Sequence, residues 1–136
     1  MIVYERPIKF DEVDAARIVF FGRFLNYAHE AMEHFFSGLE GGYAGLIVDR
    51  GIGFPAVEVT MKFARPVRYG DTLLIETSTG RLGRRSAVLS YVMRKKSEGE
   101  IVCEIEHTVV TTDLALMRSV DMPADVRAQL EAHFGR

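Results

Sequence analysis

The sequence is poor in several features that would mark other classes of protein. It has 136 residues and one cysteine, Cys103, so it cannot form an internal disulfide, and it suits a reducing compartment. No stretch approaches the ~18 consecutive apolar residues that a membrane span needs. The N-terminal MIVYERPIKF carries charges and lacks the apolar core and cleavage site of a signal peptide. We therefore expect a cytoplasmic protein with no membrane partner.

A basic excess and linker-like segments are also missing. The 17 basic and 19 acidic residues give a net charge of −2, which excludes the basic surface expected for nucleic-acid binding. The chain has no internal repeat, low-complexity tract or run of Pro, Gly or Ser. With 48% hydrophobic and 26% charged residues, it has an ordinary globular composition. These features predict one domain over residues 1–136, large enough to bury a core.

One long helix and several strands are predicted from the spacing of apolar residues. Residues 2–10 are rich in β-branched and aromatic types and predict a first strand. A helical pattern begins near Phe21 and ends at SGLEGG, with these apolar positions: Phe21, Phe24, Leu25, Ala28, Met32, Phe35, Phe36 and Leu39. Beyond Pro55 the pattern alternates, and it predicts strands at VEVTMKF, TLLIETSTGRL, SAVLSYVMRKK and EIVCEIEHTVVTTD, with SEGE as a hairpin turn and MPADVRAQLEAHF as a closing helix.

This order of elements predicts an α+β fold. The long helix has no second long helix to pack against, so it must lie on the antiparallel sheet. The strand SAVLSYVMRK has apolar residues on both faces, Leu89 and Tyr91 on one and Val88 and Val92 on the other. The second face then needs cover, which favours a homo-oligomer.

The stretch FDEVDAARIVFFGRF, residues 10–24, places acids directly before an apolar run and a helix start. With the following residues to Ala31 it resembles the opening motif of the 4-hydroxybenzoyl-CoA thioesterase-like acyl-CoA thioesterases of the hotdog-fold superfamily. MKFARPVRYGDTL resembles a second motif of the family, and GRRSAVLSYVM and MRSVDMPADVRAQL match more loosely. Many relatives carry a glycine where this chain has Arg17.

The resemblance implies an antiparallel sheet wrapped around one long central helix. It also implies dimers joined through a continuous sheet, often paired again, so we expect a homodimer or homotetramer. The active site would lie at the dimer interface and use residues of both subunits. The implied substrate is an acyl-CoA, and the implied chemistry uses no metal and no organic cofactor.

Asp14 takes the place of the family's catalytic aspartate. A carboxylate can attack a thioester carbon or deprotonate a water that does so, and the apolar run behind Asp14 can exclude bulk water. The alternative is that Asp14 only caps a turn, the commoner role of Asp beside small residues. Asp11 and Glu12 are expected to be solvated.

The helix start can supply the groups that stabilise the oxyanion. The first amides of a helix lack partners, and the helix dipole favours negative charge there. The resemblance points to the backbone N–H of Phe21, with that of Gly22 close behind.

Three further residues carry weaker signals. His29 in the helix either contacts the substrate or is a packed or surface histidine. His107 lies in phase with apolar residues and is interpreted as a satisfied core residue. Cys103, on the same face, is interpreted as a small buried hydrophobe.

Coenzyme A carries phosphates that favour arginine partners. The resemblance places nucleotide contacts at Arg84, Arg85 and Ser86 and at Arg118. Each arginine could equally be a solvated surface charge, and Arg65 is interpreted as structural at its bend.

Two functions remain open from the sequence. The first is an acyl-CoA thioesterase acting on an aryl or a short or medium acyl group. The second is a non-catalytic hotdog module that binds acyl-CoA, which would have no need of an acid at Asp14. A hotdog dehydratase is disfavoured because the His–acid pair it would use is not found.

Overall fold

The computed structural model describes residues 1–135 as one α+β unit. In chain order the elements are β1 (Ile2–Pro7), the 3₁₀ turn η1 (Phe10–Glu12), α1 (Arg23–Phe35), α2 (Gly42–Ala44), the π-helical turn η2 (Gly45–Asp49), β2 (Ile52–Gly53), β3 (Ala56–Phe63), β4 (Thr72–Leu82), β5 (Ser86–Lys95), β6 (Ile101–Val110), β7 (Thr112–Asp113), β8 (Arg118–Ser119) and α3 (Ala124–Glu131). The predicted long helix and main strands are present. The first strand ends at Pro7 instead of residue 10, and α1 begins at Arg23, slightly later than predicted.

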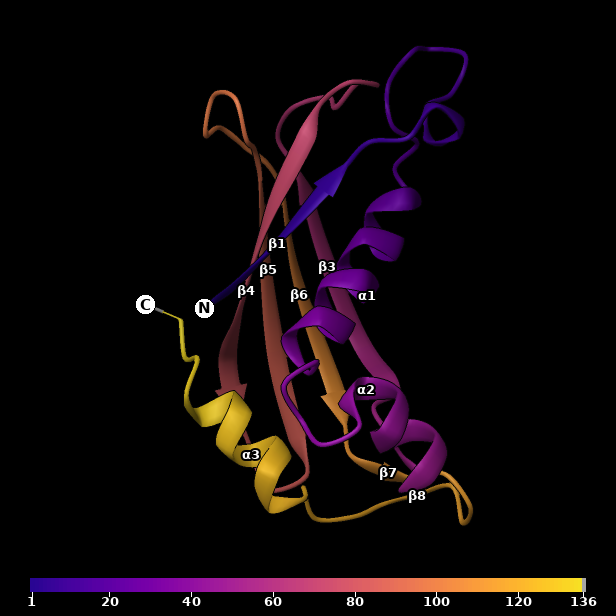
Figure 1. The fold of residues 1–136 in the computed structure, drawn as a ribbon, viewed down its shortest axis with the longest axis vertical. Helices are drawn as coiled ribbons and strands as arrows, with labels where there is room; N and C mark the ends of the chain where they lie inside the picture. Colours follow the sequence, from indigo (N-terminus) through magenta and orange to yellow (C-terminus); the bar gives the residue numbers. More distant parts are fainter. Residues whose placement is uncertain (136) are drawn as a thin grey trace.

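The main sheet has the order β1-β4-β5-β6-β3 with every neighbouring pair antiparallel. Hairpins join β4 to β5 and β5 to β6. The second is the predicted SEGE turn, in which Gly99 has a positive φ of 74°. α1 runs along one face of this sheet, and α3 lies near the end where β4 meets β5 (Figure 1). A small sheet of order β2-β7-β8 lies at that same end.

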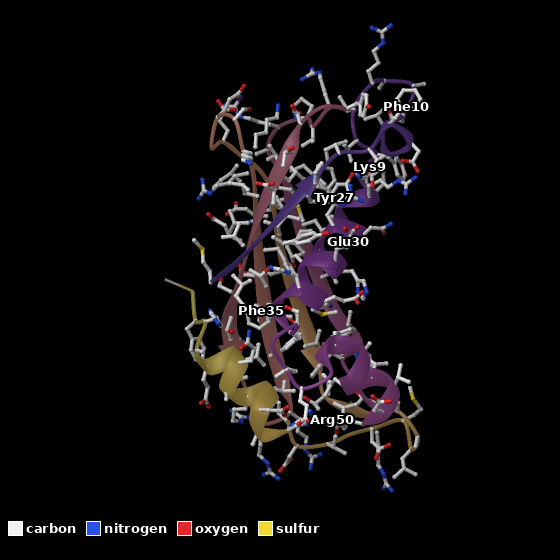
Figure 2. The ribbon with its side chains drawn as sticks, in the orientation of Figure 1. Lys9, Phe10, Tyr27, Glu30, Phe35 and Arg50 are labelled. Carbon is white, nitrogen blue, oxygen red and sulfur yellow. The ribbon has the colours of Figure 1, made fainter. Side chains whose placement is uncertain are left out.

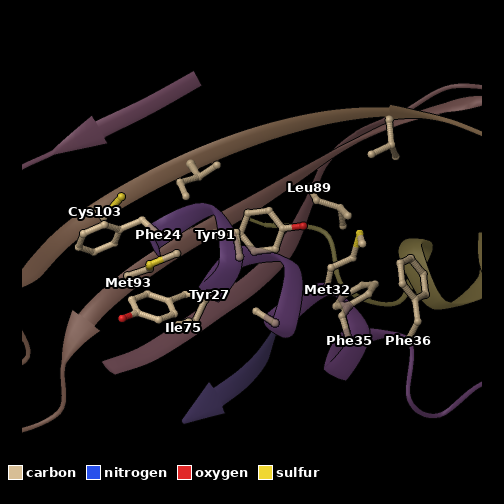
Figure 3. Packing of buried hydrophobic residues seen from close by; sticks show 14 of the residues in the cluster. Phe24, Tyr27, Met32, Phe35, Phe36, Ile75, Leu89, Tyr91, Met93 and Cys103 are labelled. Carbon is tan, nitrogen blue, oxygen red and sulfur yellow. The ribbon is translucent and has the colours of Figure 1, made fainter. Parts of the chain in front are cut away.

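The core is the layer between α1 and the sheet. α1 buries Phe24, Tyr27, Ala28, Ala31, Met32 and Phe35. They pack against alternate side chains of the central strands, including Ile75, Leu89, Tyr91 and Met93 (Figure 3). Two residues of the predicted apolar face do not belong to this layer, since Phe21 is 64% exposed and Leu25 is 46% exposed. Phe21 lies before α1, and its ring instead meets Phe63 of the edge strand β3, with ring centroids 6.5 Å apart.

The outer face of the sheet is more polar than predicted. On β5, Val92 lies between Glu76 of β4 and Glu104 of β6, and Ser90 lies beside Glu106. β5 does carry Val88 and Val92 on this face as predicted, but the neighbouring strands present carboxylates there, so the outer face as a whole is not apolar.

Exposed apolar side chains gather instead along β3. Within residues 1–135 this edge strand pairs only with β6. Its Val57, Val59 and Phe63 are exposed, although Val59 and Phe63 alternate toward the inner face. Such an edge leaves unpaired backbone groups beside apolar side chains, which is the pattern of a surface that another strand covers.

Candidate active site

Asp14 lies in a narrow loop that folds back on itself directly before α1. Its backbone N–H donates to the carbonyl of Ile18 at 3.0 Å, and the amide of Phe20 donates to the carbonyl of Glu12 at 3.4 Å. The segment that enters this loop and the segment that leaves it therefore run side by side. Because Phe20 directly precedes the first turn of α1, the loop brings Asp14 close to the helix start.

The carboxylate of Asp14 is exposed and oriented by one hydrogen bond. Its Oδ1 accepts from the backbone N–H of Ala16 at 2.8 Å, so the turn-capping interpretation is correct for this oxygen. Within residues 1–135, Oδ2 has no hydrogen-bond partner. One oxygen thus fixes the group while the other remains available, so the cap does not exclude a chemical role.

The first turn before α1 leaves backbone donors without acceptors. The amides of Arg23, Phe24 and Leu25 donate to the carbonyls of Phe20, Phe21 and Gly22 at 2.9, 3.2 and 3.3 Å. No acceptor within the described chain pairs with the N–H of Phe21 or Gly22. These two donors, at the positive end of a 13-residue helix, are suited to stabilise negative charge on an oxygen.

A cavity of about 380 Å³ joins these groups. It is lined by Asp14, Ile18, Val19, Phe20, Phe21, Phe24, Phe63, Ala64, Arg65, Pro66 and Val67. The lining is mainly apolar, and it combines the Asp14 loop, the start of α1 and the segment that follows β3. Asp14 and Phe21 therefore line one mainly apolar cavity, and Gly22, whose amide also lacks an acceptor within residues 1–135, directly follows Phe21.

Phenylalanine rings form much of the cavity wall. The rings of Phe20 and Phe21 lie 4.7 Å apart, and Phe63 meets Phe21 and Phe24 edge-on at 6.5 and 5.4 Å. Edge-to-face contacts of this kind favour a flat aromatic or an aliphatic guest over a polar one.

His29 lies away from this cavity. Its Nε2 lies 2.7 Å from Glu33 Oε2, one turn further along α1, and its side chain is mainly solvent-exposed. The structure thus agrees with the surface interpretation of His29 in a single chain.

Arg84 and Arg85 lie together between β4 and β5. Both guanidinium groups reach Asp121, through Nε at 3.2 and 2.9 Å, and these contacts lower the pKa of Asp121. Arg85 also donates to the hydroxyl of Ser119, next to Arg118 on β8. The structure brings the three predicted arginines to one exposed region, with Ser86 at the start of β5.

The arginine region and Asp14 lie at opposite ends of the chain's sheet. Pro7, shortly before the Asp14 loop, pairs with Thr72 at the start of β4, whereas Arg84 follows Leu82 at the other end of that strand. An 11-residue strand spans roughly 33 Å. Figure 1 shows the loop before α1 at the end of the molecule opposite α3 and β8. Within one chain the arginine region therefore lies at the end of β4 away from Asp14.

The prediction for Cys103 is confirmed, whereas His107 has a hydrogen-bond partner but is only partly buried. Nδ1 of His107 lies 3.1 Å from the hydroxyl of Tyr91, and burial together with the charge of His29 lowers the pKa of His107. Cys103 is buried, and burial with the nearby charge of Glu104 raises its pKa to about 12. Neither residue lines the cavity beside Asp14.

One prediction about the opening motif is wrong: Glu12 is not solvated. Its side chain is 6% exposed and forms an ion pair with Arg6, with Nη2 to Oε2 at 2.6 Å. Arg6 also contacts Glu30 of α1 at 2.9 Å. The three residues come from different elements and share no periodic spacing, so the sequence carries no simple signal of their contact. Figure 2 shows Lys9, Tyr27 and Glu30 near this end of α1.

Other kinds of site find no support in residues 1–135. No group of three or more His, Cys, Asp or Glu side chains in this range could hold a metal ion. No helix there is long and apolar enough to cross a membrane.

Known proteins resemble the chain over nearly its whole length. The model of the Thioesterase-like superfamily matches residues 8–130. A 1,4-dihydroxy-2-naphthoyl-CoA hydrolase of Nostoc punctiforme is 27% identical over 128 residues, covering 94% of this chain and 78% of that protein. The long-chain acyl-CoA thioesterase FadM of Escherichia coli is 27% identical over 110 residues, covering 80% of this chain and 81% of that protein.

A solved structure agrees with these relatives. The structure of a gentisyl-coenzyme A thioesterase is 31% identical, with a TM-score of 0.82, and the match covers 92% of this chain and 98% of that one. The predicted hotdog fold and the predicted class of enzyme, a thioester hydrolase, are thereby confirmed. The chain belongs to the Thioesterase-like superfamily.

Proposed function

We propose that this chain hydrolyses an acyl-CoA thioester to the free acid and CoA, with Asp14 as the catalytic carboxylate. One observation carries the proposal: Asp14, whose Oδ2 has no partner within residues 1–135, lines the same apolar cavity as Phe21 at the start of α1, where two amides lack acceptors in that range. Asp14 acts either as nucleophile, forming an anhydride and releasing the CoA thiolate, or as the base that activates water. The amides of Phe21 and Gly22 polarise the thioester carbonyl in both cases.

The acyl group is proposed to occupy the cavity walled by phenylalanine rings. The named relatives act on dihydroxynaphthoyl-CoA, gentisyl-CoA and long-chain acyl-CoA, so the family tolerates both aryl and alkyl groups. The edge-on rings of Phe21, Phe24 and Phe63 favour an aryl or a short or medium acyl group of matching size.

A second copy of the chain is proposed to complete the site. The exposed apolar edge of β3 supports pairing between two copies, as a homodimer or as half of a homotetramer. Arg84, Arg85, Ser86 and Arg118 would then hold the CoA phosphates at the Asp14 site of the partner. They are assigned to the partner's site because β4, which spans roughly 33 Å, separates them from Asp14 of their own chain. A role for His29 at the partner's site and a cytoplasmic location stay predictions.

A hydrolysis screen tests the function. The wild-type protein is mixed with aryl- and alkyl-CoA thioesters, and free CoA is followed with a thiol reagent. Turnover of at least one thioester supports the enzyme. Tight binding of an acyl-CoA without any turnover would instead favour the non-catalytic binding module.

A further inference from the structure

Arg6, the next-to-last residue of β1, has every N–H group of its guanidinium paired. Nη1 and Nη2 donate to the two oxygens of Glu12 at 2.8 and 2.6 Å, and Nε and Nη2 donate to Glu30 at 2.9 and 3.3 Å. Nη1 also donates to the carbonyl of Pro7 at 2.6 Å. These contacts use all five donors of the side chain. The guanidinium carbon lies 4.8 Å from the centre of the Tyr27 ring, so one face of the group is covered as well.

Glu12 is held as firmly from the other side. Its Oε1 also accepts from the backbone N–H of Lys9 at 2.7 Å, which closes the turn η1. The side chains of Arg6 and Glu12 are 13% and 6% exposed, so the bidentate pair is shielded from solvent. The hydroxyl of Tyr4 adds a hydrogen bond to Glu30 at 2.9 Å. The cluster therefore ties β1, η1 and α1 together.

Glu12 is also the base of the loop that carries Asp14. Its carbonyl accepts from the amide of Phe20, and the next pair inward, Val13 and Val19, forms an antiparallel bridge. On its second side the loop is fixed where the amide of Val19 donates to the carbonyl of Val67 at 2.7 Å. The loop thus has two anchors, the ion pair of Glu12 and the hydrogen bond between Val19 and Val67. Without the ion pair only the second would remain, and the distance between Asp14 and the start of α1 would no longer be fixed.

We infer that Arg6 and Glu12 are positioning residues for Asp14. Neither lines the cavity, so neither touches substrate there. Their ion pair holds the loop of residues 12–20 at the distance from α1 at which the Asp14 carboxylate and the amides of Phe21 and Gly22 act on one thioester. This inference rests on the proposed function of Asp14.

The test replaces the bidentate group without removing the charge. Arg6→Lys keeps one ion pair but cannot bridge Glu12 and Glu30 together. We expect Arg6→Lys to fold and to lower kcat at least ~10-fold with little change in KM, because a displacement of about 1 Å can cost up to ~100-fold in rate. A folded Arg6→Lys protein with wild-type kcat would overturn the inference.

Combining Arg6→Lys with Asp14→Asn separates positioning from general damage. If Arg6 acts only by placing the Asp14 carboxylate, it should cost little further activity once that carboxylate is gone. An equal loss of kcat in both backgrounds would mean that Arg6 supports the fold in general.

Hydrogen exchange provides a readout that is independent of activity. In Arg6→Lys the amides of Asp14, Val19 and Phe20 should exchange faster, while those of β5 remain protected. Arg50→Lys is the matched control, because it disrupts a bidentate pair with Asp125, at 2.7 and 2.9 Å, at the opposite end of the molecule (Figure 2). It should leave both kcat and the exchange of residues 12–20 unchanged.

The two proposals fail in different ways. If Asp14→Asn alone keeps wild-type turnover, the proposed function of Asp14 is wrong, and with it a positioning role toward that carboxylate. If Asp14→Asn is inactive but Arg6→Lys changes neither kcat nor the exchange of residues 12–20, the proposed function stands and the inference about Arg6 and Glu12 is wrong.

Discussion

The Asp14 carboxylate illustrates how one side chain can serve a turn and a reaction together. Oδ1 accepts from the Ala16 amide, which restricts rotation of the group, while Oδ2 has no partner within residues 1–135. A carboxylate without this hydrogen bond would need to be ordered each time a substrate binds. The local turn therefore prepares the group for the chemistry that we propose.

At the tip of the same loop, Arg17 has a φ of +67°, a conformation that side chains with a Cβ adopt at a cost. We predict that Arg17→Gly raises the free energy of unfolding by up to about 1 kcal/mol, because the relief of strain exceeds the added entropy of glycine in the unfolded chain. Arg17→Ala keeps the strain and should bring no gain. Unfolding in urea measures the free energy of unfolding of the wild type and of the two variants. Equal stability of the Gly and Ala variants would show that the backbone at residue 17 is not strained.

Phe63 provides a test of the acyl cavity. Its ring meets Phe21 and Phe24 but is half exposed, so Phe63→Ala should fold. We predict a loss of up to ~10-fold in kcat/KM for aryl thioesters, the equivalent of one aromatic contact of up to about 1.4 kcal/mol. Val57→Ala, on the same strand but outside the cavity lining, is the control. A similar loss in both variants would mean that the effect comes from β3 and not from the cavity.

Among the elements, regular segments could be predicted from the sequence and irregular ones could not. The alternation in VEVTMKF and SAVLSYVMRK sets which side chains share a face, so both strands were predictable. Alternation does not reveal what the neighbouring strands present, which is why the polar outer face around Val92 was missed. The start of α1 was predictable to within about two residues.

Most of the candidate site was predictable because its parts are close in sequence. Asp14 and the amides of Phe21 and Gly22 lie within one loop and its helix. The ion pair of Arg6 and Glu12 was not predictable from the sequence. It depends on how the 3₁₀ turn folds back on β1, and no periodic pattern describes such a turn. Phe63 was predicted as one of a row of apolar strand residues, and only the fold brings it beside Phe21 and Phe24.

The turn η1 also predicts how stability depends on pH. Burial alone would raise the pKa of Glu12, but hydrogen bonds from Arg6 and from the Lys9 amide outweigh it, so the pKa is lowered from the ordinary value of 4.5. The unfolded chain then binds this proton first as the pH falls. The stabilisation by Glu12 is full above pH 4.5 and is lost progressively below it.

We therefore predict that Glu12→Gln flattens the fall of stability in acid. The free energy of unfolding, measured in urea from about pH 6 to about pH 3, should fall less for this variant than for the wild type. Glu98→Gln, on the exposed turn before β6, is the control because Glu98 makes no ion pair within residues 1–135. A variant whose acid slope equals that of the wild type would contradict the assigned pairing.

At the scale of the whole molecule, the separation of Asp14 from the arginine region has a consequence for assembly. The two regions lie at opposite ends of β4, and the apolar edge of β3 offers a surface along which a second copy can run in the opposite direction. Antiparallel pairing of two copies would bring the arginine end of one beside the Asp14 end of the other.

Mixing two inactive variants tests this arrangement. Asp14→Asn lacks the carboxylate, and an Arg84→Met/Arg85→Met double variant should bind CoA thioesters weakly. If each site takes Asp14 from one subunit and the arginines from the other, unfolding and refolding the mixture should restore roughly a quarter of wild-type activity at low substrate, because half of the dimers are mixed and one of their two sites is intact. No recovery, although mixed oligomers form, would contradict a shared site.

The central claim, that the Asp14 carboxylate performs the chemistry, has one direct measurement. Asp14→Asn keeps an oxygen that accepts from the Ala16 amide, so the loop should stay folded while the charge is lost. The rate of free CoA release from the best thioester of the screen is compared between this variant and the wild type. We predict a fall in kcat of at least ~100-fold with unchanged thermal stability. Release of CoA by Asp14→Asn at close to the wild-type rate would contradict the account.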